Sequence, residues 1–124
     1  MEMKFYICPT CGQIVAIVKG TKVPVMCCGK PMKELVPGET DAAVEKHVPV
    51  YEVEGNIVKV TVGSVDHPMT PEHYIEWIAI QTKYGNQRKK LSPESEPKTC
   101  FALCEGDEVL AVYAYCNLHS LWKA

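Results

Sequence analysis

Apolar and polar side chains alternate along most of the second part of the chain. The pattern runs through three segments, each with two alternating runs: VPVYEVEGNIVKVTVGS at 48–64, HYIEWIAIQTKYGNQRKKL at 73–91 and KTCFALCEGDEVLAVYAYC at 98–116. Successive side chains of a β-strand point to opposite faces, so a period of two over a short run is typical of a half-buried strand. The pattern predicts six or seven short strands.

Each pair of runs is separated by residues that favour tight turns. The predicted turns are Gly55–Asn56, Gly85–Asn86 and Glu105–Gly106–Asp107. Glycine and asparagine supply the backbone angles that connections between antiparallel strands need. No long amphipathic helix interrupts the strands. Short strands at such intervals predict an antiparallel sandwich or barrel of about 80 residues.

The first 36 residues have a different pattern, because glycines, prolines and four cysteines interrupt their short apolar runs. A segment of this size buries too little apolar surface to fold alone, so it needs a bound metal or a contact between subunits. VPGETDAAVEK, at 36–46, has the composition of a linker with a brief helical turn, which Thr40 or Asp41 is expected to cap. We expect a small domain at 1–36, a linker at 37–46 and a β-sandwich domain at 47–124.

The charge and hydropathy of the chain exclude several classes of partner. The formal net charge is −2, so no global field attracts nucleic acid or an acidic membrane. No apolar run is long enough to span a membrane, and the first residues, MEMKFYICPTCG, lack the layout of a signal peptide. We expect a cytoplasmic protein that binds neither nucleic acid nor membranes.

Seven cysteines are many for a chain of 124 residues, and an odd number cannot all pair as disulfides. In a reducing compartment, metal binding is the favoured use of such cysteines. Four of them form two pairs separated by fifteen residues, Cys8 with Cys11 and Cys27 with Cys28. Four thiolates at this spacing suit a tetrahedral ion, which is either zinc or a single iron.

The adjacent pair Cys27–Cys28 is unusual for a zinc ribbon, in which both cysteine pairs are spaced. Gly12 and Gly29 each follow a cysteine, and a residue without a side chain suits a tight knuckle there. The segments YICPTCG and MCCGKPM resemble desulforedoxin, a small domain in which four cysteines hold one non-haem iron. The resemblance favours iron over zinc, in an electron-transfer role.

All four histidines lie in the larger part of the chain, which also contains the Cys-x-x-His motif of Cys116 and His119. We expect His47 to open a strand, His67 and His73 to bracket the loop HPMTPEH, and the motif to close the last strand. Each histidine alone is compatible with a surface or core position. Together, four imidazoles and a thiolate fit a first-row ion such as iron and leave a sixth coordination position open.

EKHVP, HPMTPEHYIEWI and CNLHSLW are similar to the metal-binding segments of superoxide reductases. With the four-cysteine segment they match the two-iron form of this family, desulfoferrodoxin, over essentially the whole chain. The resemblance implies an all-β protein, with a desulforedoxin-like domain followed by an immunoglobulin-like antiparallel β-sandwich. It also implies two mononuclear irons, one held by Cys8, Cys11, Cys27 and Cys28, the other by His47, His67, His73 and His119 with Cys116 as the axial ligand.

The same resemblance assigns roles to the two residues before His47. Lys46 matches a lysine that attracts the substrate, and Glu45 matches a carboxylate that can occupy the open position in the oxidised resting state. The implied reaction is the one-electron reduction of superoxide to hydrogen peroxide, with re-reduction by an external donor such as a rubredoxin-like protein. The family also implies a homodimer, in which the first domains pair.

Other functions remain open from the sequence. A pure electron carrier without superoxide chemistry and a zinc-stabilised binding module are alternatives, and neither needs an open coordination position. Dismutation of superoxide is a third alternative. It is disfavoured because a thiolate ligand stabilises ferric iron, which must oxidise a second superoxide in that reaction.

Three further features have less specific explanations. Cys100 and Cys104 have the spacing of residues on one strand face, where we expect them to pack in the core. The basic turn KYGNQRKK is either a docking site for an acidic electron donor or a solvated hairpin. Four aromatic residues are expected in the core or in the wall of the site: Trp77, Tyr113, Tyr115 and Trp122.

Overall fold

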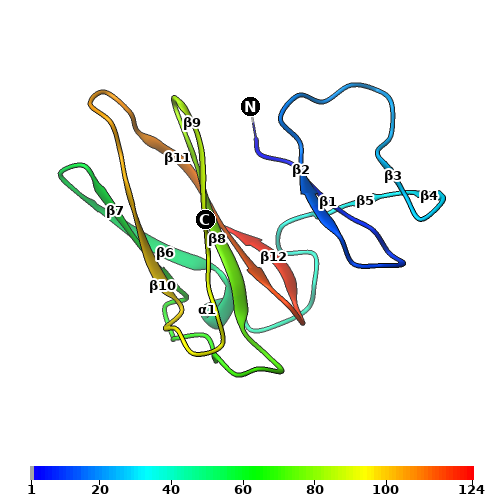
Figure 1. The fold of residues 1–124 in the computed structure, drawn as a ribbon. Coiled ribbons are helices and arrows are strands. Elements are labelled where there is room, and N and C mark those ends of the chain that lie inside the picture. Colours follow the sequence, from blue (N-terminus) through cyan, green and yellow to red (C-terminus); the bar gives the residue numbers. More distant parts are fainter. Residues whose placement is uncertain (1) are drawn as a thin grey trace. The chain divides into compact units, whose positions relative to one another are not determined.

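The computed structural model describes residues 2–124 and contains two compact units, one that ends at Val36 and one that begins at Pro37. In both units, the regular secondary structure is almost entirely antiparallel strands (Figure 1). The described residues contain one short helix, and no helix among them is long and apolar enough to cross a membrane. The all-β fold predicted from the alternating pattern is confirmed.

The first unit contains a three-stranded sheet and a two-stranded hairpin. The sheet has the order β2, β1, β5, and the hairpin pairs β3 with β4. These strands are β1 (Phe5–Ile7), β2 (Ile14–Ala16), β3 (Met26–Cys27), β4 (Lys30–Pro31) and β5 (Lys33–Glu34). The buried apolar residues described in this unit are Phe5, Cys8, Met32 and Leu35. So small a core agrees with the prediction that this segment needs a metal or a subunit contact.

The second unit is a sandwich of two antiparallel sheets. One sheet has the order β10, β7, β6, and the other has the order β12, β11, β8, β9. The seven strands are β6 (Pro49–Glu54), β7 (Ile57–Val62), β8 (Ile75–Thr82), β9 (Gly85–Lys90), β10 (Lys98–Ala102), β11 (Val109–Cys116) and β12 (Ser120–Lys123). Their number agrees with the predicted six or seven, and the two-sheet arrangement confirms the predicted sandwich.

One hydrophobic core joins the two sheets. Val58, Val60 and Val62, at alternate positions of β7, are fully buried and belong to the same cluster as Ile80 of β8. Cys116, the last residue of β11, is also a member of this cluster and is 0 % exposed. Because a close-packed core resists displacement, the surrounding core holds the Cys116 side chain in a fixed position.

Two of the predicted turns differ in their outcome. Gly55–Asn56 connects β6 to β7, as predicted. The prediction for Gly85–Asn86 was wrong by two residues, since Gly85 already pairs with Thr82 and the turn lies at Lys83–Tyr84. A carboxylate far along the chain fixes this turn: Asp107 accepts hydrogen bonds from the Tyr84 N–H at 3.0 Å and from the Thr82 hydroxyl at 2.9 Å.

The third predicted turn, at 105–107, connects the two sheets. The strands on either side are β10 and β11, which pair with β7 and β8 rather than with each other. Cys100 and Cys104 were predicted to pack in the core, and this was wrong because both are exposed. Phe101 and Leu103 occupy the inward positions of this segment, so residues of the opposite parity face solvent.

The segment before β6 forms the helix α1 (Val44–His47). Its N-cap is Ala43, without a side-chain cap bond, so the prediction of a cap at Thr40 or Asp41 was wrong. We expected His47 to open a strand, and this was wrong, because His47 is the last residue of the helix. Val48 takes an extended conformation before Pro49, since a residue that precedes proline disfavours the helical region.

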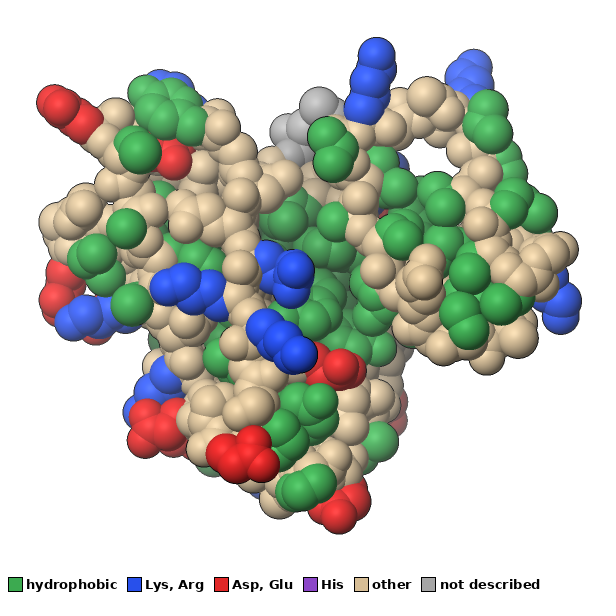
Figure 2. Space-filling view, viewed as in Figure 1, with side chains coloured by type: hydrophobic (Ala, Val, Ile, Leu, Met, Phe, Trp, Pro, Cys, Tyr) green, Lys and Arg blue, Asp and Glu red, His purple; other side chains and the backbone are tan. Residues whose placement is uncertain are grey.

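Acidic and basic side chains are interspersed on the face of the molecule that Figure 2 shows. No histidine is visible there, and His47 and His67 are only 3 % and 2 % exposed. The predicted aromatic positions are also buried: Trp77, Tyr113, Tyr115 and Trp122. His47 and His67 therefore lie in the interior of the second unit, while His73 and His119 are half-buried.

Candidate metal centres

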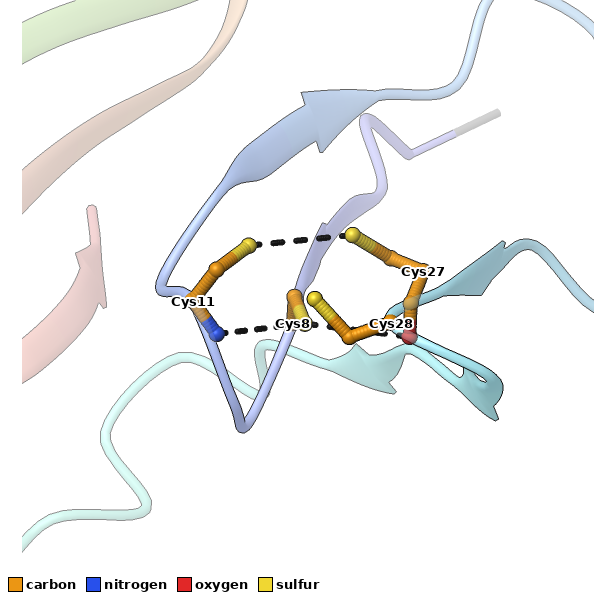
Figure 3. A group of neighbouring side chains, drawn as sticks. All are labelled: Cys8, Cys11, Cys27 and Cys28. Atoms are coloured by element: carbon orange, nitrogen blue, oxygen red, sulfur yellow. Dashed lines mark hydrogen bonds between the residues drawn. The ribbon is translucent and has the colours of Figure 1, made fainter.

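The four cysteines of the first unit converge on one point (Figure 3). Their sulfur atoms all lie within 4.8 Å of one another, and the Sγ atoms of Cys11 and Cys27 are 3.7 Å apart. Four sulfurs at about 2.3 Å from a central ion define a tetrahedron with edges of about 3.8 Å. All four cysteines are free thiols. The cluster therefore has the dimensions of a tetrahedral metal site.

Hydrogen bonds and backbone angles shape the two knuckles of this cluster. The Cys11 N–H donates to the Cys8 sulfur at 3.4 Å, and this bond is the main cause that lowers the pKa of Cys8 to about 6. The backbone has positive φ at Gly12 (81°), Cys28 (51°) and Gly29 (73°). Left-handed glycines in both knuckles support the predicted roles of Gly12 and Gly29.

The sulfurs cannot all ionise without a cation between them. The pKa of Cys27 is raised to about 12, first because of its contact with the sulfur of Cys8 and then because of that with Cys11. A lowered pKa in one thiol and a raised pKa in its neighbour mean that one thiolate forms easily and the next does not. A divalent or trivalent metal ion removes this conflict, because it binds thiolates and neutralises their charge.

Four imidazole rings form a closed square in the second unit. Neighbouring rings meet edge to face, with centroids 4.7 Å apart for His47 and His67, 4.6 Å for His67 and His73, 5.1 Å for His73 and His119, and 4.8 Å for His119 and His47. Across the square, the rings of His47 and His73 are 6.3 Å apart and only 28° from parallel. Because this diagonal distance is longer than each of the four distances between neighbouring rings, the four rings surround one central point.

Carbonyl groups determine which nitrogen two of these rings present to the centre. Nδ1 of His47 lies 2.7 Å from the Ala43 carbonyl oxygen, and Nδ1 of His67 lies 2.6 Å from that of Pro68. A carbonyl only accepts, so each Nδ1 carries the hydrogen and each neutral ring keeps a lone pair on Nε2. The two Nε2 atoms are 3.2 Å apart, and they point two lone pairs at each other.

Protonation of one ring would remove the repulsion between the Nε2 lone pairs of His47 and His67, but it is unfavourable at this site. Burial lowers the pKa of His67 to about 4 and also lowers the pKa of His47 and His73. Nε2 of His73 is buried and has no hydrogen-bond partner, although buried ring nitrogens are normally satisfied. An unpartnered buried nitrogen and two opposed lone pairs are the features of a metal site whose imidazoles are neutral.

Cys116 completes the donor set. Ligand atoms of His47, His67, His73 and Cys116 all lie within 4.8 Å of one another, and Nδ1 of His119 lies 3.9 Å from the Cys116 sulfur. Burial raises the pKa of this thiol, while hydrogen bonds from backbone N–H groups at 118 and 119 oppose the shift. Those N–H groups favour the thiolate, which is the form that binds metal.

Glu45 and Lys46 lie on the exposed part of helix α1, immediately before His47. Burial is the main cause that lowers the pKa of His47 and of His73, and the positive charge of Lys46 is a smaller cause in the same direction. The negative charge of Glu45 has the opposite effect on His47. Both side chains therefore act electrostatically on the square of imidazoles from its solvent side.

The structure adds a backbone contact at Gly63 that sequence patterns did not indicate. A Cβ atom at this position would lie 2.6 Å from the carbonyl oxygen of Glu45 and 2.9 Å from that of Val48. The same Glu45 carbonyl accepts hydrogen bonds from the Val65 N–H at 2.9 Å and the Ser64 hydroxyl at 3.2 Å. A glycine at the end of a strand run is the one signal for such a close approach.

Trp122 forms part of the wall around the imidazoles. Its ring lies 5.0 Å from that of His47, and its indole N–H donates to the His119 carbonyl at 3.0 Å. The Trp122 side chain thus contacts two residues of the square, His47 and His119, which are far apart in the sequence. This agrees with the expectation that Trp122 is a core or site-wall residue.

Comparisons with known proteins agree with both sites. The Desulfoferrodoxin family profile matches residues 39–124, and that of the desulfoferrodoxin N-terminal domain matches residues 1–35. A desulfoferrodoxin homolog of Archaeoglobus fulgidus is 48% identical over 98% of this chain and 96% of its own. The desulfoferrodoxin of Nitratidesulfovibrio vulgaris is 44% identical over 99% of this chain and 96% of its own.

A solved structure extends the likeness to three dimensions. The crystal structure of the superoxide reductase from Treponema pallidum has a TM-score of 0.85 and 41% identity, and the match covers 100% of this chain and 99% of that one. A superoxide reductase of Pyrococcus horikoshii is 38% identical over 64% of this chain and 84% of its own. The two donor clusters match the two iron centres of desulfoferrodoxin. The chain therefore belongs to the desulfoferrodoxin family.

Proposed function

We propose that this protein is a superoxide reductase, which adds one electron and two protons to superoxide to form hydrogen peroxide. The observation that carries the proposal is the closed square of four imidazoles, two buried and two half-buried, with the Cys116 sulfur beside it. The structure with 41% identity over the whole chain is that of a superoxide reductase. When bound at this site, ferrous iron supplies the electron.

The hydrogen bonds of the rings support one set of ligand atoms. His47 and His67 use Nε2, because their Nδ1 atoms are bonded to carbonyls. His73 uses its unpartnered Nε2, and His119 uses Nδ1, which lies 3.0 Å from Nε2 of His47. With the Cys116 sulfur, these are five donors. An iron ion held by these five donors would have room for a sixth ligand, such as a small anion.

The thiolate of Cys116 favours reduction of superoxide over dismutation. Backbone N–H groups at 118 and 119 donate to the sulfur and favour its ionised form, but burial raises the pKa of the thiol overall, so a bound metal ion is needed to stabilise the thiolate. A thiolate ligand raises electron density at iron and stabilises the oxidised state. Oxidation of a second superoxide, which dismutation requires, is therefore disfavoured. A plain electron carrier has no use for the open position.

Lys46 is proposed to attract the substrate, and Glu45 is proposed to occupy the open position in the oxidised resting state. The Lys46 ammonium group is exposed, and its charge acts on His47 and His73. In a chain of net charge −2, it is a local attraction for a small anion, which raises the rate of encounter. Glu45 is exposed on the same helix, and its negative charge also acts on His47, which supports its proposed role when superoxide is absent.

The first unit is proposed to hold a second iron through Cys8, Cys11, Cys27 and Cys28. Its sulfur spacing suits a tetrahedral ion. We assign residues 1–36 to this domain, 37–46 to a linker and 47–124 to the catalytic sandwich. The division of the chain after Val36 supports the first of these boundaries.

The electron donor, the assembly and the compartment are also proposals. Arg88, Lys89 and Lys90 on the edge strand β9 are exposed, and they suit an acidic donor such as a rubredoxin-like protein. Val18 and Val23 are 100% and 76% exposed, which supports pairing of the first domains in a homodimer. All seven cysteines are free, as in a reducing compartment such as the cytoplasm.

A count of electrons tests the function. A flux of superoxide is supplied to the iron-loaded protein together with a chemical reductant, and reductant consumed, peroxide formed and oxygen released are measured. The proposal predicts one electron consumed and one peroxide formed for each superoxide, with no oxygen released by the protein. Release of one oxygen for every two superoxides, without use of reductant, would instead identify a dismutase.

A further inference from the structure

The turn between β11 and β12 contains an asparagine whose side chain bonds to another metal-binding segment. Oδ1 of Asn117 accepts a hydrogen bond from the Tyr74 N–H at 3.0 Å, and its Nδ2 donates to the Glu72 carbonyl at 3.0 Å. The backbone N–H of Asn117 also donates to the Tyr74 carbonyl at 3.2 Å. These three bonds hold the main chain on both sides of His73.

His73 depends on such support more than two other members of the square. His47 and His67 each fix their ring through a hydrogen bond from Nδ1 to a carbonyl. Among the described residues, the ring of His73 makes no comparable bond, and its Nε2 is buried without a partner. Its remaining hydrogen bonds are those to Thr70, within its own loop. The position of the ring is therefore set by its main chain.

The chemistry of asparagine suits this position. A primary amide has an acceptor and two donors in one rigid plane, so it can bond an N–H and a carbonyl of the same segment at once. Aspartate keeps the acceptor but places an oxygen against the Glu72 carbonyl, and alanine loses both groups. Asn117 directly follows Cys116 in sequence, so the same residue joins the loop of His73 to the strand that ends in the sulfur.

We propose that Asn117 is a positioning residue, which fixes His73 relative to Cys116 and thereby sets the geometry of the metal centre. This inference rests on the proposed function, because it assigns a role in the same site. Asn117 touches no substrate. It acts by holding one ligand segment against another, as residues behind metal ligands do in other proteins.

The test compares iron retention in Asn117→Ala with that in the unchanged protein. Competition of the ferrous, iron-loaded chain with a chelator is expected to show about 10–100-fold weaker binding at the catalytic site. The visible band from the thiolate to ferric iron is expected to shift. The four-cysteine iron in the same molecule is an internal reference that stays unchanged. The exposed Asn86 gives a matched control, Asn86→Ala, with unchanged retention and band.

A second background shows whether the effect passes through His73. If Asn117 acts by positioning that ring, Asn117→Ala produces little further loss of iron in a His73→Ala protein. An equal loss in both backgrounds overturns the proposal, and so do unchanged retention and an unchanged band in the single variant.

If Asn117→Ala does not fold, Asn117→Asp serves as the test. An intermediate loss of iron is then expected, and unchanged iron retention with an unchanged visible band overturns the proposal. None of these measurements uses superoxide, so failure here is distinct from failure of the proposed reductase activity.

Discussion

Nε2 of His47 and Nε2 of His67 lie 3.2 Å apart, although each ring bonds a carbonyl through its Nδ1. In neutral rings this contact places two lone pairs against each other. A bound metal ion turns it into a pair of adjacent ligands, and burial makes protonation an unfavourable alternative. The folded chain therefore presents two neutral imidazoles as adjacent metal ligands.

Removal of iron is expected to destabilise the second unit. A ligand at 100 times its dissociation constant contributes about 2.7 kcal/mol to the stability of the folded state, and relief of the contact between His47 and His67 adds to this. Thermal unfolding of the chelated protein should occur at lower temperature than that of the iron-loaded protein. Addition of ferrous iron should reverse the change, and equal melting temperatures with and without iron would contradict the expectation.

Cys116→Ser is expected to abolish most of the visible absorption of the catalytic centre and most of its activity. The hydroxyl of serine is a poor substitute for a thiolate, whose charge transfer to iron gives the band and whose donation favours the oxidised metal. Absorption and superoxide consumption are measured on the same sample. The exposed Cys100 provides the control, Cys100→Ser, which leaves both unchanged. Retention of both in Cys116→Ser would reject the assignment of Cys116 as a metal ligand.

Lys46→Ala is expected to slow the association of superoxide and to flatten its dependence on ionic strength. The substitution removes a cation whose field reaches His47 and His73, and such fields accelerate encounter with anions by a factor of about 10 or more. Pulse radiolysis at several salt concentrations measures the rate constant, while metal content stays constant. Lys98→Ala, on the exposed face of β10, is the matched control. Unchanged association kinetics in Lys46→Ala would refute the role of this residue.

Cys11→Ser is expected to disturb only the four-cysteine site. Cys11 is exposed and contributes one of the sulfurs of the first unit, whereas the imidazoles all lie in the second unit. Iron content should fall towards one ion per chain, and reduction of superoxide by the prereduced catalytic centre should continue at nearly the same rate. Loss of that reaction would mean that the first site is more than a relay or a scaffold.

Gly63→Ala is expected to cost roughly 1–3 kcal/mol of stability, because overpacking of this size has such costs. The added methyl group would meet the Glu45 and Val48 carbonyls at 2.6 and 2.9 Å, and it displaces the segment that carries Lys46 and His47. Denaturant unfolding measures the loss of stability. Gly20→Ala, whose methyl group would have its nearest contact at 3.6 Å, is the control. A stability equal to that of the control would disprove the close approach.

Much of the fold follows from local patterns in the sequence. The period of two predicted the strands, because each strand of the sandwich buries one face and alternate residues reveal it. The pattern did not show which parity faces inward at Cys100 and Cys104, since both parities are apolar there. The position of the Lys83–Tyr84 turn depends on Asp107, which is distant in sequence, and no local signal contains that contact.

The donor residues of both sites could be identified from the sequence, since cysteine and histidine are scarce and have few other uses in such patterns. Their convergence was expected from the combined donor set and from the family resemblance, but its geometry depends on pairing between distant strands, which no local pattern contains. Gly63 and Asn117 show the same limit. Each supports the site through backbone atoms of another segment, and no feature of the sequence names the segment that it contacts.

A single-turnover experiment tests the central claim most directly. The fully reduced protein is mixed without oxygen with one equivalent of superoxide per chain, and the thiolate-to-iron band and the peroxide formed are recorded together. The account predicts that the band of the catalytic centre appears at once, with one peroxide formed for each centre oxidised and the four-cysteine iron still reduced. A catalytic centre that stays reduced while superoxide disappears, or oxidation of the four-cysteine iron alone, would contradict it.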